Sequence, residues 1–265
     1  MHRPLPDGIV RTCTVKREWV RWYAVLTVDV ADIPAHTVTE PVNPVGIDLG
    51  LNHIAALSTG GTVEPPKFFH RSEGSLRRAQ MKLSRKVKGS NRWHKQKVVV
   101  QRRYAKVSDS RRDFAHKLTT VWAKQHDLIA FEDMDVGDMV HGHLAKSIMD
   151  AGWGMLRQMC AYKAQRSNGM YVEVETKNTT QECPKCGKLA DPPLTLKDRV
   201  YRCPCGNTED RDVNASRNIL GRALKAVRQG MPELTRVERV ASTFSKRRRA
   251  VSAKREPPRT LGVAF

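Results

Sequence analysis

Three acidic residues stand at positions where a carboxylate is costly to bury. Asp48 lies inside a short apolar run, Val-Gly-Ile-Asp-Leu-Gly. Glu132 ends another, Leu-Ile-Ala-Phe-Glu, and Asp212 stands at the start of a predicted helix. An acid at a buried strand end is unfavourable unless it is paired or bound to a metal ion. Mg²⁺ prefers carboxylate oxygens, and two such ions can support phosphodiester hydrolysis. Asp48, Glu132 and Asp212 are therefore the candidate catalytic and magnesium-binding residues.

Each of these acids also has a simpler interpretation. Asp48 or Glu132 can form a salt bridge with one of the many arginines, and Asp212 can act as an N-cap or first-turn acid. A salt bridge explains one such acid more readily than several. Spacing alone leaves these alternatives open. We interpret the neighbouring acids Asp133 and Asp210 as structural.

Four of the six cysteines lie within 23 residues: Cys183, Cys186, Cys203 and Cys205. No export signal is visible at the N-terminus, so the cluster indicates a metal site rather than disulfides. We predict one structural zinc ion with no open coordination position. The second pair has one intervening residue instead of two, which we expect to strain the tetrahedral geometry. Cys13 and Cys160 are isolated and are expected to be small buried residues.

The charge of the chain points to a polyanionic partner. The 265 residues include 47 Lys and Arg against 27 Asp and Glu, which gives a net charge of +20. Such a balance favours DNA or RNA over a small acidic metabolite. No apolar run approaches the ~18 residues of a transmembrane helix. We expect a cytoplasmic protein associated with the nucleoid.

A basic segment spans residues 67–117, which hold 17 basic residues and three acidic ones. Like charges four residues apart destabilise a helix unless a polyanion neutralises them, so we expect this segment to bind nucleic acid. Trp93, Tyr104 and Phe114 either stack on bases or belong to the apolar stripe of the helices. The candidate nucleic-acid-binding residues are Arg77, Arg78, Lys82, Arg85, Lys86, Lys88, Arg92, Lys95, Lys97, Arg102, Arg103, Arg111 and Arg112.

Apolar patterning predicts the elements that must position these residues. An α/β fold with one mixed sheet follows from the order of strands and helices. We expect strands over 10–16, 20–30, 45–50, 53–58, 62–63, 128–131 and 170–175, and helices over 74–126 with a break near 88–90, over 145–167 and over 213–228.

Five short segments carry a family resemblance when taken in order. They are Gly46–Gly50, Arg111–Lys117, Phe131–Met134, Cys183–Gly187 and Asp210–Ala215. Together they resemble the TnpB (OrfB-like) proteins of bacterial insertion sequences, which are relatives of the type V CRISPR nucleases. The resemblance covers about residues 40–222, and each segment is a modest signal by itself.

The resemblance implies an RNase H-like, RuvC-type nuclease domain with an inserted zinc ribbon. Asp48, Glu132 and Asp212 match the three metal-binding acids of the family's split active site. Family members use a guide RNA to direct cleavage of matching DNA, so sequence is read by base pairing. The resemblance therefore implies an RNA-guided DNA endonuclease with two Mg²⁺ ions, one Zn²⁺ ion, and DNA and guide RNA as partners.

The resemblance also implies a domain layout. We expect a β-rich remnant and linker over 1–40, where the family carries a longer front part with a β-barrel and a helical lobe. The nuclease domain is expected over 41–180, with the basic helical insert at 67–126, and again over 210–230. The zinc ribbon is expected over 181–209 and a basic, disordered tail over 231–265.

Two other functions fit parts of the pattern. A decayed nucleic-acid-binding remnant or repressor would explain the short front part, but the intact acid set argues against it. A strand-transfer transposase would use the same fold and acids, but the cysteine cluster just before the third acid fits TnpB-like proteins better.

Overall fold

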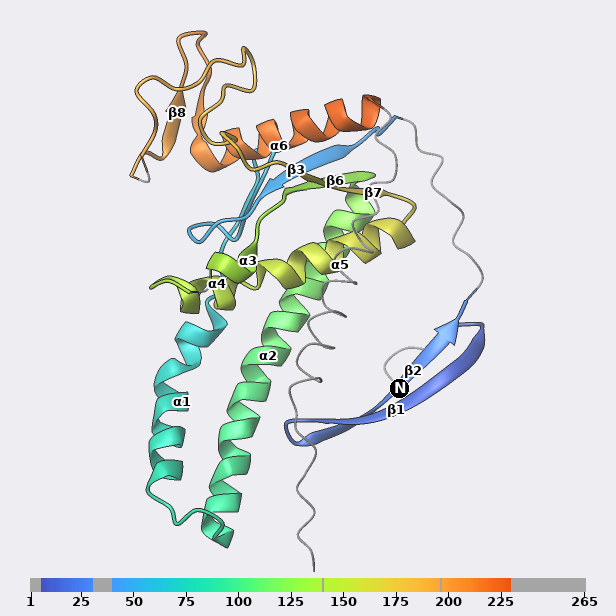
Figure 1. The fold of residues 1–265 in the computed structure, drawn as a ribbon, viewed down its shortest axis with the longest axis vertical. Coiled ribbons are helices and arrows are strands. Elements are labelled where there is room, and N and C mark those ends of the chain that lie inside the picture. Colours follow the sequence, from blue (N-terminus) through green and yellow to red (C-terminus); the bar gives the residue numbers. More distant parts are fainter. Residues whose placement is uncertain (1–5, 31–39, 140, 196, 230–265) are drawn as a thin grey trace, which may run out of the picture.

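The computed structural model describes residues 6–30, 40–139, 141–195 and 197–229 (Figure 1). The expected tail over 231–265 lies outside this part. The elements in chain order are β1 (Ile9–Glu18), β2 (Arg21–Asp29), β3 (Pro44–Asp48), β4 (Ala55–Leu57), β5 (Thr62–Val63), α1 (Phe68–Ser84), α2 (Asn91–Gln125), β6 (Leu128–Glu132), α3 (Val136–Met139), α4 (Ala145–Ala151), α5 (Trp153–Arg166), β7 (Met170–Val174), β8 (Val200–Arg202), β9 (Thr208–Asp210) and α6 (Arg211–Arg228).

Five strands form the central mixed sheet, in the order β5-β4-β3-β6-β7. The strands β3, β6 and β7 run parallel, whereas β4 is antiparallel to β3 and β5 is antiparallel to β4. The parallel strands are short continuous apolar runs because helices cover both of their faces. The predicted fold class, a mixed α/β sheet with flanking helices, is confirmed.

The two faces of the sheet have separate cores. On one face Ile47, Ile129 and Phe131 pack with residues of α2 and α5. On the other face Ala130 and Val172 pack against Ile219 of α6. Figure 1 shows α6 on one side of β3, β6 and β7, with α5 and α2 on the other. Side chains alternate along each strand, so every second residue of β3 and β6 points toward α6.

The basic segment forms a long helical hairpin, α1 and α2, that projects from the sheet (Figure 1). The predicted break is confirmed: the Ser90 hydroxyl accepts a hydrogen bond from the Trp93 N–H at 3.2 Å and caps α2. α1 begins at Phe68 rather than near residue 74. The Phe69 N–H donates to both carboxylate oxygens of Asp150 in α4, at 2.9 and 3.0 Å, so a distant residue caps this helix.

The single helix expected over 145–167 is wrong. Gly152 adopts a left-handed conformation, with φ of 68°, and separates α4 from α5. Glycine takes this conformation without a steric penalty. The break turns α4 away from α5, and Asp150 of α4 then reaches both α1 and Arg111 of α2.

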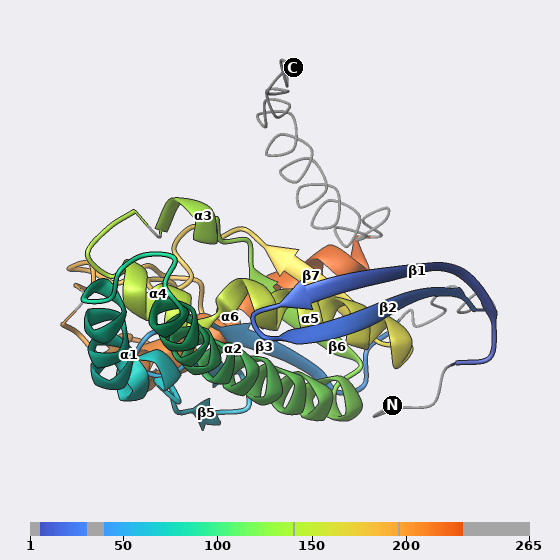
Figure 2. The ribbon, with the colours of Figure 1, turned by 90° about the horizontal axis from the view of Figure 1, so that it is seen from below.

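The N-terminal hairpin β1–β2 is held to α2 through its turn. The ring of Trp19 stacks on Tyr104, with centroids 5.6 Å apart and planes 3° apart. The Arg21 guanidinium pairs with Asp109 at 2.9 Å. Figure 2 shows the hairpin lying as a separate ribbon beside the main sheet and helices. Cys13, expected to be buried, is exposed on β1 because the hairpin has no sheet covering it in the described residues.

Within these described ranges, no helix is long and apolar enough to cross a membrane.

Candidate functional site

Asp48 and Glu132 end neighbouring parallel strands. Ile47 of β3 pairs with Phe131 of β6, so the next residue in each strand is an acid. Ile47 and Phe131 point into the core beneath α2 and α5. By alternation, both acids point to the opposite face, which α6 covers. The fold thus places two half-buried carboxylates side by side at one end of the sheet.

Asp212 reaches the same sheet edge because α6 crosses β3 very closely at Gly46. A Cβ at Gly46 would lie 2.1 Å from the Ser216 carbonyl oxygen and 2.7 Å from the Leu220 nitrogen. Only glycine allows this backbone approach. Asp212 occupies the first turn of α6, and its side chain is 15% exposed.

Asp210, not Asp212, caps α6. The Asp210 carboxylate accepts hydrogen bonds from the N–H groups of Asp212, at 2.8 Å, and Val213, at 3.2 Å. The N-cap role therefore belongs to Asp210, in agreement with the interpretation of Asp210 as a structural residue. The Asp212 carboxylate lies 3.8 Å from the Arg211 guanidinium and has no capping role.

Asp48 lies in the field of the other two acids. Burial raises the pKa of Asp48 well above its usual value, and the charges of Glu132 and Asp212 raise it further. The Arg211 charge and the Leu49 N–H oppose this rise. Among the described residues, neither Asp48 nor Glu132 forms an ion pair within 4.0 Å, so the salt-bridge interpretation finds no partner. A crowded set of dehydrated carboxylates favours a proton or a bound cation.

Glu132 receives a hydrogen bond from a residue that the sequence patterns did not single out. The Thr179 hydroxyl donates to one Glu132 oxygen, and Thr179 is buried. Burial raises the pKa of Glu132, while the Thr179 hydrogen bond and the charge of Arg222 lower it. Arg222 in turn pairs with Glu182 at 2.8 Å. No spacing signal marks Thr179, because its contact with Glu132 joins residues far apart in the chain.

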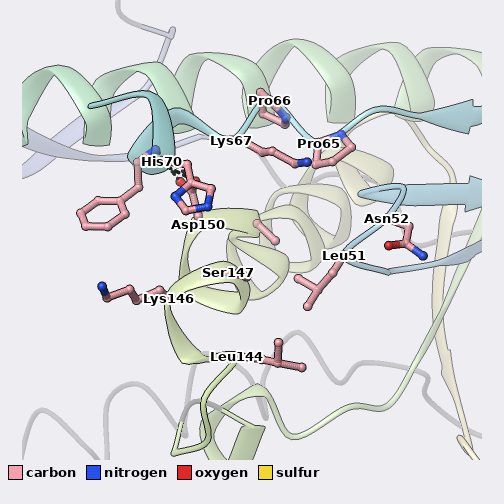
Figure 3. Close-up of a pocket in the computed structure, with 12 residues that line it drawn as sticks. Leu51, Asn52, Pro65, Pro66, Lys67, His70, Leu144, Lys146, Ser147 and Asp150 are labelled. Carbon is pink, nitrogen blue, oxygen red and sulfur yellow. Dashed lines mark hydrogen bonds between the residues drawn. The ribbon is translucent and has the colours of Figure 1, made fainter. Parts of the chain in front are cut away.

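A cavity of about 340 Å³ lies next to the loop that follows Asp48 (Figure 3). Leu51, Pro65 and Leu144 give it apolar walls, and Lys67 and Lys146 lie at its edge. One of its lining residues, Asn52, contacts Arg199. With its amide oxygen turned toward Arg199, Asn52 accepts hydrogen bonds of 2.7 and 2.8 Å. The Arg199 carbonyl accepts from the N–H of Arg211, the residue before Asp212, at 2.8 Å.

The four clustered cysteines converge. Their sulfur atoms all lie within 4.8 Å of one another, with Cys183 and Cys205 at 3.6 Å and Cys186 and Cys203 at 3.5 Å. Tetrahedral zinc with Zn–S bonds near 2.3 Å needs sulfurs about 3.8 Å apart. The donor set and its spacing therefore fit one tetrahedral metal ion.

The two cysteine pairs reach this arrangement through turns of different length. The Gly187 N–H donates to the Cys183 carbonyl, and the Gly206 N–H donates to the Cys203 carbonyl, both at 2.9 Å. The second turn is shorter by one residue, and Gly206 accommodates it at φ of 87°. The expected strain therefore does not keep the sulfurs apart. Hydrogen bonding, chiefly from the Cys205 backbone, lowers the pKa of Cys203, whereas the hydrogen bond with Cys203 raises the pKa of Cys205, so in the metal-free cluster these two thiols share the deprotonation.

The basic segment presents its charges to solvent. Twelve of the thirteen candidate nucleic-acid-binding side chains are exposed on α1, α2 and the turn between them. Arg78, Lys82 and Arg103 line a cavity of about 140 Å³ between the two helices. Arg111 differs from the rest: it donates two hydrogen bonds to Asp150, at 2.8 and 2.6 Å, and is half-buried. Its main contact therefore ties α2 to α4.

The aromatic residues of the segment are used mostly within the fold. Tyr104 stacks on Trp19, and its hydroxyl accepts a hydrogen bond from Gln80 at 2.7 Å. Phe114 packs edge to face with Phe68 at 6.0 Å. Trp93 lies near the free end of the hairpin with Lys97 over its ring at 5.1 Å. The apolar-stripe interpretation thus holds for Tyr104 and Phe114.

Two family models match successive parts of the chain. The OrfB IS605 family, described as "Probable transposase", matches residues 24–142. The family described as "Cas12f1-like, TNB domain" matches residues 153–219. The first match includes Asp48 and Glu132, and the second includes the four cysteines and Asp212.

Two curated proteins match most of this chain. A protein of Streptomyces pristinaespiralis named "Putative RNA-guided DNA endonuclease" is 36% identical over 266 residues, which is 98% of this chain and 64% of that protein. "Putative RNA-guided DNA endonuclease InsQ" of Escherichia coli strain K12 is 35% identical over 234 residues, covering 80% of this chain and 56% of that protein. The chain thus spans less than two thirds of the length of these relatives.

A solved structure shares the fold. The chain in "Cryo-EM structure of CRISPR-Cas12f Ternary Complex" superposes with a TM-score of 0.51 at 19% identity, covering 81% of this chain and 46% of that chain. The chain is thus similar to the OrfB IS605 family over residues 24–142 and to the Cas12f1-like TNB domain over residues 153–219, in line with the resemblance to TnpB (OrfB-like) proteins.

Proposed function

We propose that this chain is a Mg²⁺-dependent DNA endonuclease, guided by RNA and associated with a transposable element. The observation that supports the proposal is that Asp48 and Glu132 follow a paired position of neighbouring strands and that the charges of Glu132 and Asp212 both act on Asp48. A bound divalent cation offsets these like charges. The curated relatives are named for RNA-guided action on DNA, which supports DNA and a guide RNA as the partners.

In the proposed reaction Asp48, Glu132 and Asp212 would hold two Mg²⁺ ions, and bound Mg²⁺ would supply water activation and charge stabilisation for phosphodiester hydrolysis. Asp48 and Glu132 offer oxygens from the ends of rigid strands, and Asp212 offers one from the first turn of α6. Sites on such elements keep their side chains more precisely placed than sites on loops.

The basic residues outside the acid site would bind the nucleic acid. The exposed cations of α1 and α2 bind phosphates without reading sequence, and the guide RNA reads the DNA by base pairing. Lys67 adds a cation to the lining of the cavity next to the loop that follows Asp48. The positive charge of α1 and α2 also supports a cytoplasmic protein that associates with the nucleoid.

The cysteine cluster fits one structural zinc ion. Cys183, Cys186, Cys203 and Cys205 would hold it with all four positions filled, so this zinc takes no direct part in the reaction. We propose the nuclease domain as residues 41–180 and 210–230, with the ribbon over 181–209 inserted between them.

The experiment is to express the chain with the DNA that flanks its gene, purify it, and sequence the nucleic acid that copurifies. The proposal predicts one abundant RNA, and Mg²⁺-dependent cleavage of a DNA duplex that matches this RNA and not of a scrambled duplex. Heterogeneous nucleic acid that dissociates in salt, with no cleavage, would favour the binding-remnant function. Products joined to target DNA would identify a strand-transfer enzyme.

A further inference from the structure

Thr179 fixes the orientation of one proposed metal-binding acid. Its hydroxyl donates to Oε1 of Glu132 and also lies 3.3 Å from the Thr176 carbonyl. Thr179 is 3% exposed, so water does not compete for this hydrogen bond. The contact holds one Glu132 oxygen and leaves Oε2 without a protein donor among the described residues. A hydroxyl in this position keeps the carboxylate from rotating.

Helix α6 holds Thr179 in turn. The Asn218 amide donates to the carbonyls of Thr179 and Glu182, both at 2.7 Å. The Asn214 amide donates to the same Glu182 carbonyl at 2.9 Å. Asn214 and Asn218 are buried polar residues on the helix that carries Asp212. The segment 179–182 is thus clamped at both ends by the element that also positions a second proposed metal-binding acid.

The same segment continues directly into the cysteine cluster. Cys183 follows Glu182, and its N–H donates to the Lys188 carbonyl at 2.9 Å. The Gln181 side chain donates to the Leu194 carbonyl at 2.9 Å and accepts from the Leu194 N–H at 2.8 Å. Thr179 therefore lies four residues before the first thiol, in a stretch whose other end is built into the ribbon. When the ribbon folds around its metal, this stretch has little freedom left.

We propose that Thr179 is a positioning residue for Glu132, and that metal at the four cysteines keeps it in place and so sets the divalent-cation affinity of the acid site. This inference rests on the proposed function, because it takes the acids as a cation site. It gives the cysteine centre a role at the active site. A ribbon that only contacted nucleic acid would leave cation binding unchanged.

The first test uses Mn²⁺ binding to the full chain, measured by calorimetry without nucleic acid. Thr179→Val removes the hydroxyl at similar volume, Thr179→Ser keeps it, and Thr180→Val is the matched control, because no described contact involves the Thr180 hydroxyl. Loss of a group that orients a ligand weakens metal binding about 10–100-fold, so we expect that loss for Thr179→Val. Thr179→Ser and Thr180→Val should bind Mn²⁺ as the unaltered chain does. Equal affinity for Thr179→Val and Thr180→Val would overturn the proposal.

The second test asks whether the cysteine centre acts through Thr179. Cys186→Ser is combined with Thr179→Val, and zinc content and Mn²⁺ affinity are measured on each form. We expect Cys186→Ser to weaken Mn²⁺ binding as Thr179→Val does, and the double variant to be no weaker than the weaker single variant. Coupling between the cysteine centre and Thr179 would be contradicted if the losses of Mn²⁺ affinity of the two single variants added up in the double variant. It would also be contradicted if a zinc-depleted Cys186→Ser chain bound Mn²⁺ as tightly as the unaltered chain.

Asp48→Asn distinguishes a failure of the proposed function from a failure of the positioning role of Thr179. If Asp48→Asn leaves Mn²⁺ binding unchanged, the acids are not the cation site and the proposed function fails. If Asp48→Asn abolishes binding while Thr179→Val preserves it, the function stands and only the positioning role is wrong. Thermal unfolding of every variant identifies any that fail to fold, and if Thr179→Val does, Thr179→Ala, which also lacks the hydroxyl, is compared with Thr179→Ser instead.

Discussion

The N–H of Asp212 donates a hydrogen bond of 2.8 Å to the carboxylate of Asp210, so two aspartates in one short motif have different tasks. The Asp210 carboxylate caps α6 by accepting hydrogen bonds from N–H groups of its first turn that have no partner within the helix. Asp212 is left to raise the pKa of Asp48 through its charge. Spacing alone did not separate a capping role from a metal-binding role for Asp212; the hydrogen bond assigns the cap to Asp210, and metal binding by Asp212 stays a prediction.

This division of tasks predicts opposite phenotypes at the two positions. Asp210→Ala removes an N-cap and should cost about 0.5–2 kcal/mol of stability, whereas Asp210→Asn, which still caps, should cost little. Asp212→Asn should leave the stability largely intact and abolish Mg²⁺-dependent cleavage. Thermal unfolding and a cleavage assay on all three variants check this. An active Asp212→Asn enzyme would refute the assignment.

The close crossing at Gly46 predicts a severe effect from a single methyl group. The atoms that a Cβ would meet are backbone atoms of α6, which cannot rotate away, so Gly46→Ala should cost about 3 kcal/mol or more. Gly221→Ala, in the same helix with nothing within 4 Å of its added Cβ, should stabilise by about 0.5–1 kcal/mol. Denaturant unfolding measures both. A harmless Gly46→Ala would mean that α6 does not lie against β3 as described.

The raised pKa of Asp48 predicts how the metal-free stability depends on pH. A carboxyl group whose pKa is higher in the folded than in the unfolded state binds protons more readily when folded. Its contribution to stability is complete below the unfolded pKa of about 3.9 and is lost as the pH rises through the folded pKa. At pH 7 the ionised site should therefore destabilise the metal-free protein.

Two measurements test this pH dependence of the metal-free stability. Asp48→Asn should unfold at a higher temperature than the unaltered chain at pH 7 without metal, and the difference should shrink toward pH 4. Adding Mg²⁺ should stabilise the unaltered chain through binding to the folded state, and should stabilise Asp48→Asn much less. Equal Mg²⁺ stabilisation of the two proteins would show that the cation binds elsewhere.

The cationic helices predict a salt-dependent binding surface. Arg78→Ala combined with Arg103→Ala removes two exposed cations that line the cavity between α1 and α2. If both contact phosphates, the slope of log K against log salt should fall by about 1–2 with the fold unchanged. Arg111→Ala should instead destabilise the protein, because it leaves the Asp150 carboxylate, which is 10% exposed, without its cationic partner. An unchanged salt slope in the double variant would place the nucleic acid on another face.

The cysteine cluster predicts one zinc ion per chain. Cys186→Ser should lose it and unfold at a lower temperature. Cys13→Ser, on the exposed face of β1, should keep both metal content and stability. Elemental analysis of the purified chains decides between these results. A zinc-free unaltered chain that keeps its full stability would count against a structural metal.

The strands and helices around the central sheet were predictable because their signals are local. Short apolar runs mark β3, β6 and β7. The Lys-Gly-Ser sequence at 88–90 marks the break between α1 and α2. The start of α1 was not predictable, since its cap is supplied by Asp150, some 80 residues away. The break at Gly152 was also missed, because a single glycine within an apolar helical pattern is usually tolerated.

The candidate site was predictable to a similar degree. Three acids at element ends marked its position, and strand register then explains why Asp48 and Glu132 are adjacent. The positioning groups were not predictable. Thr179 and Asn218 act through contacts between segments far apart in the chain, and no periodicity or motif spacing records such contacts.

The most direct measurement is Mg²⁺-dependent cleavage of DNA by the unaltered chain and by Asp48→Asn, each loaded with the RNA that copurifies. Nucleic-acid affinity is measured in parallel on the same preparations. The account predicts that Asp48→Asn binds RNA and DNA as tightly as the unaltered chain and produces no cut product at any Mg²⁺ concentration. Cleavage retained by Asp48→Asn would contradict the claim that the acids at this sheet edge hold the catalytic metal.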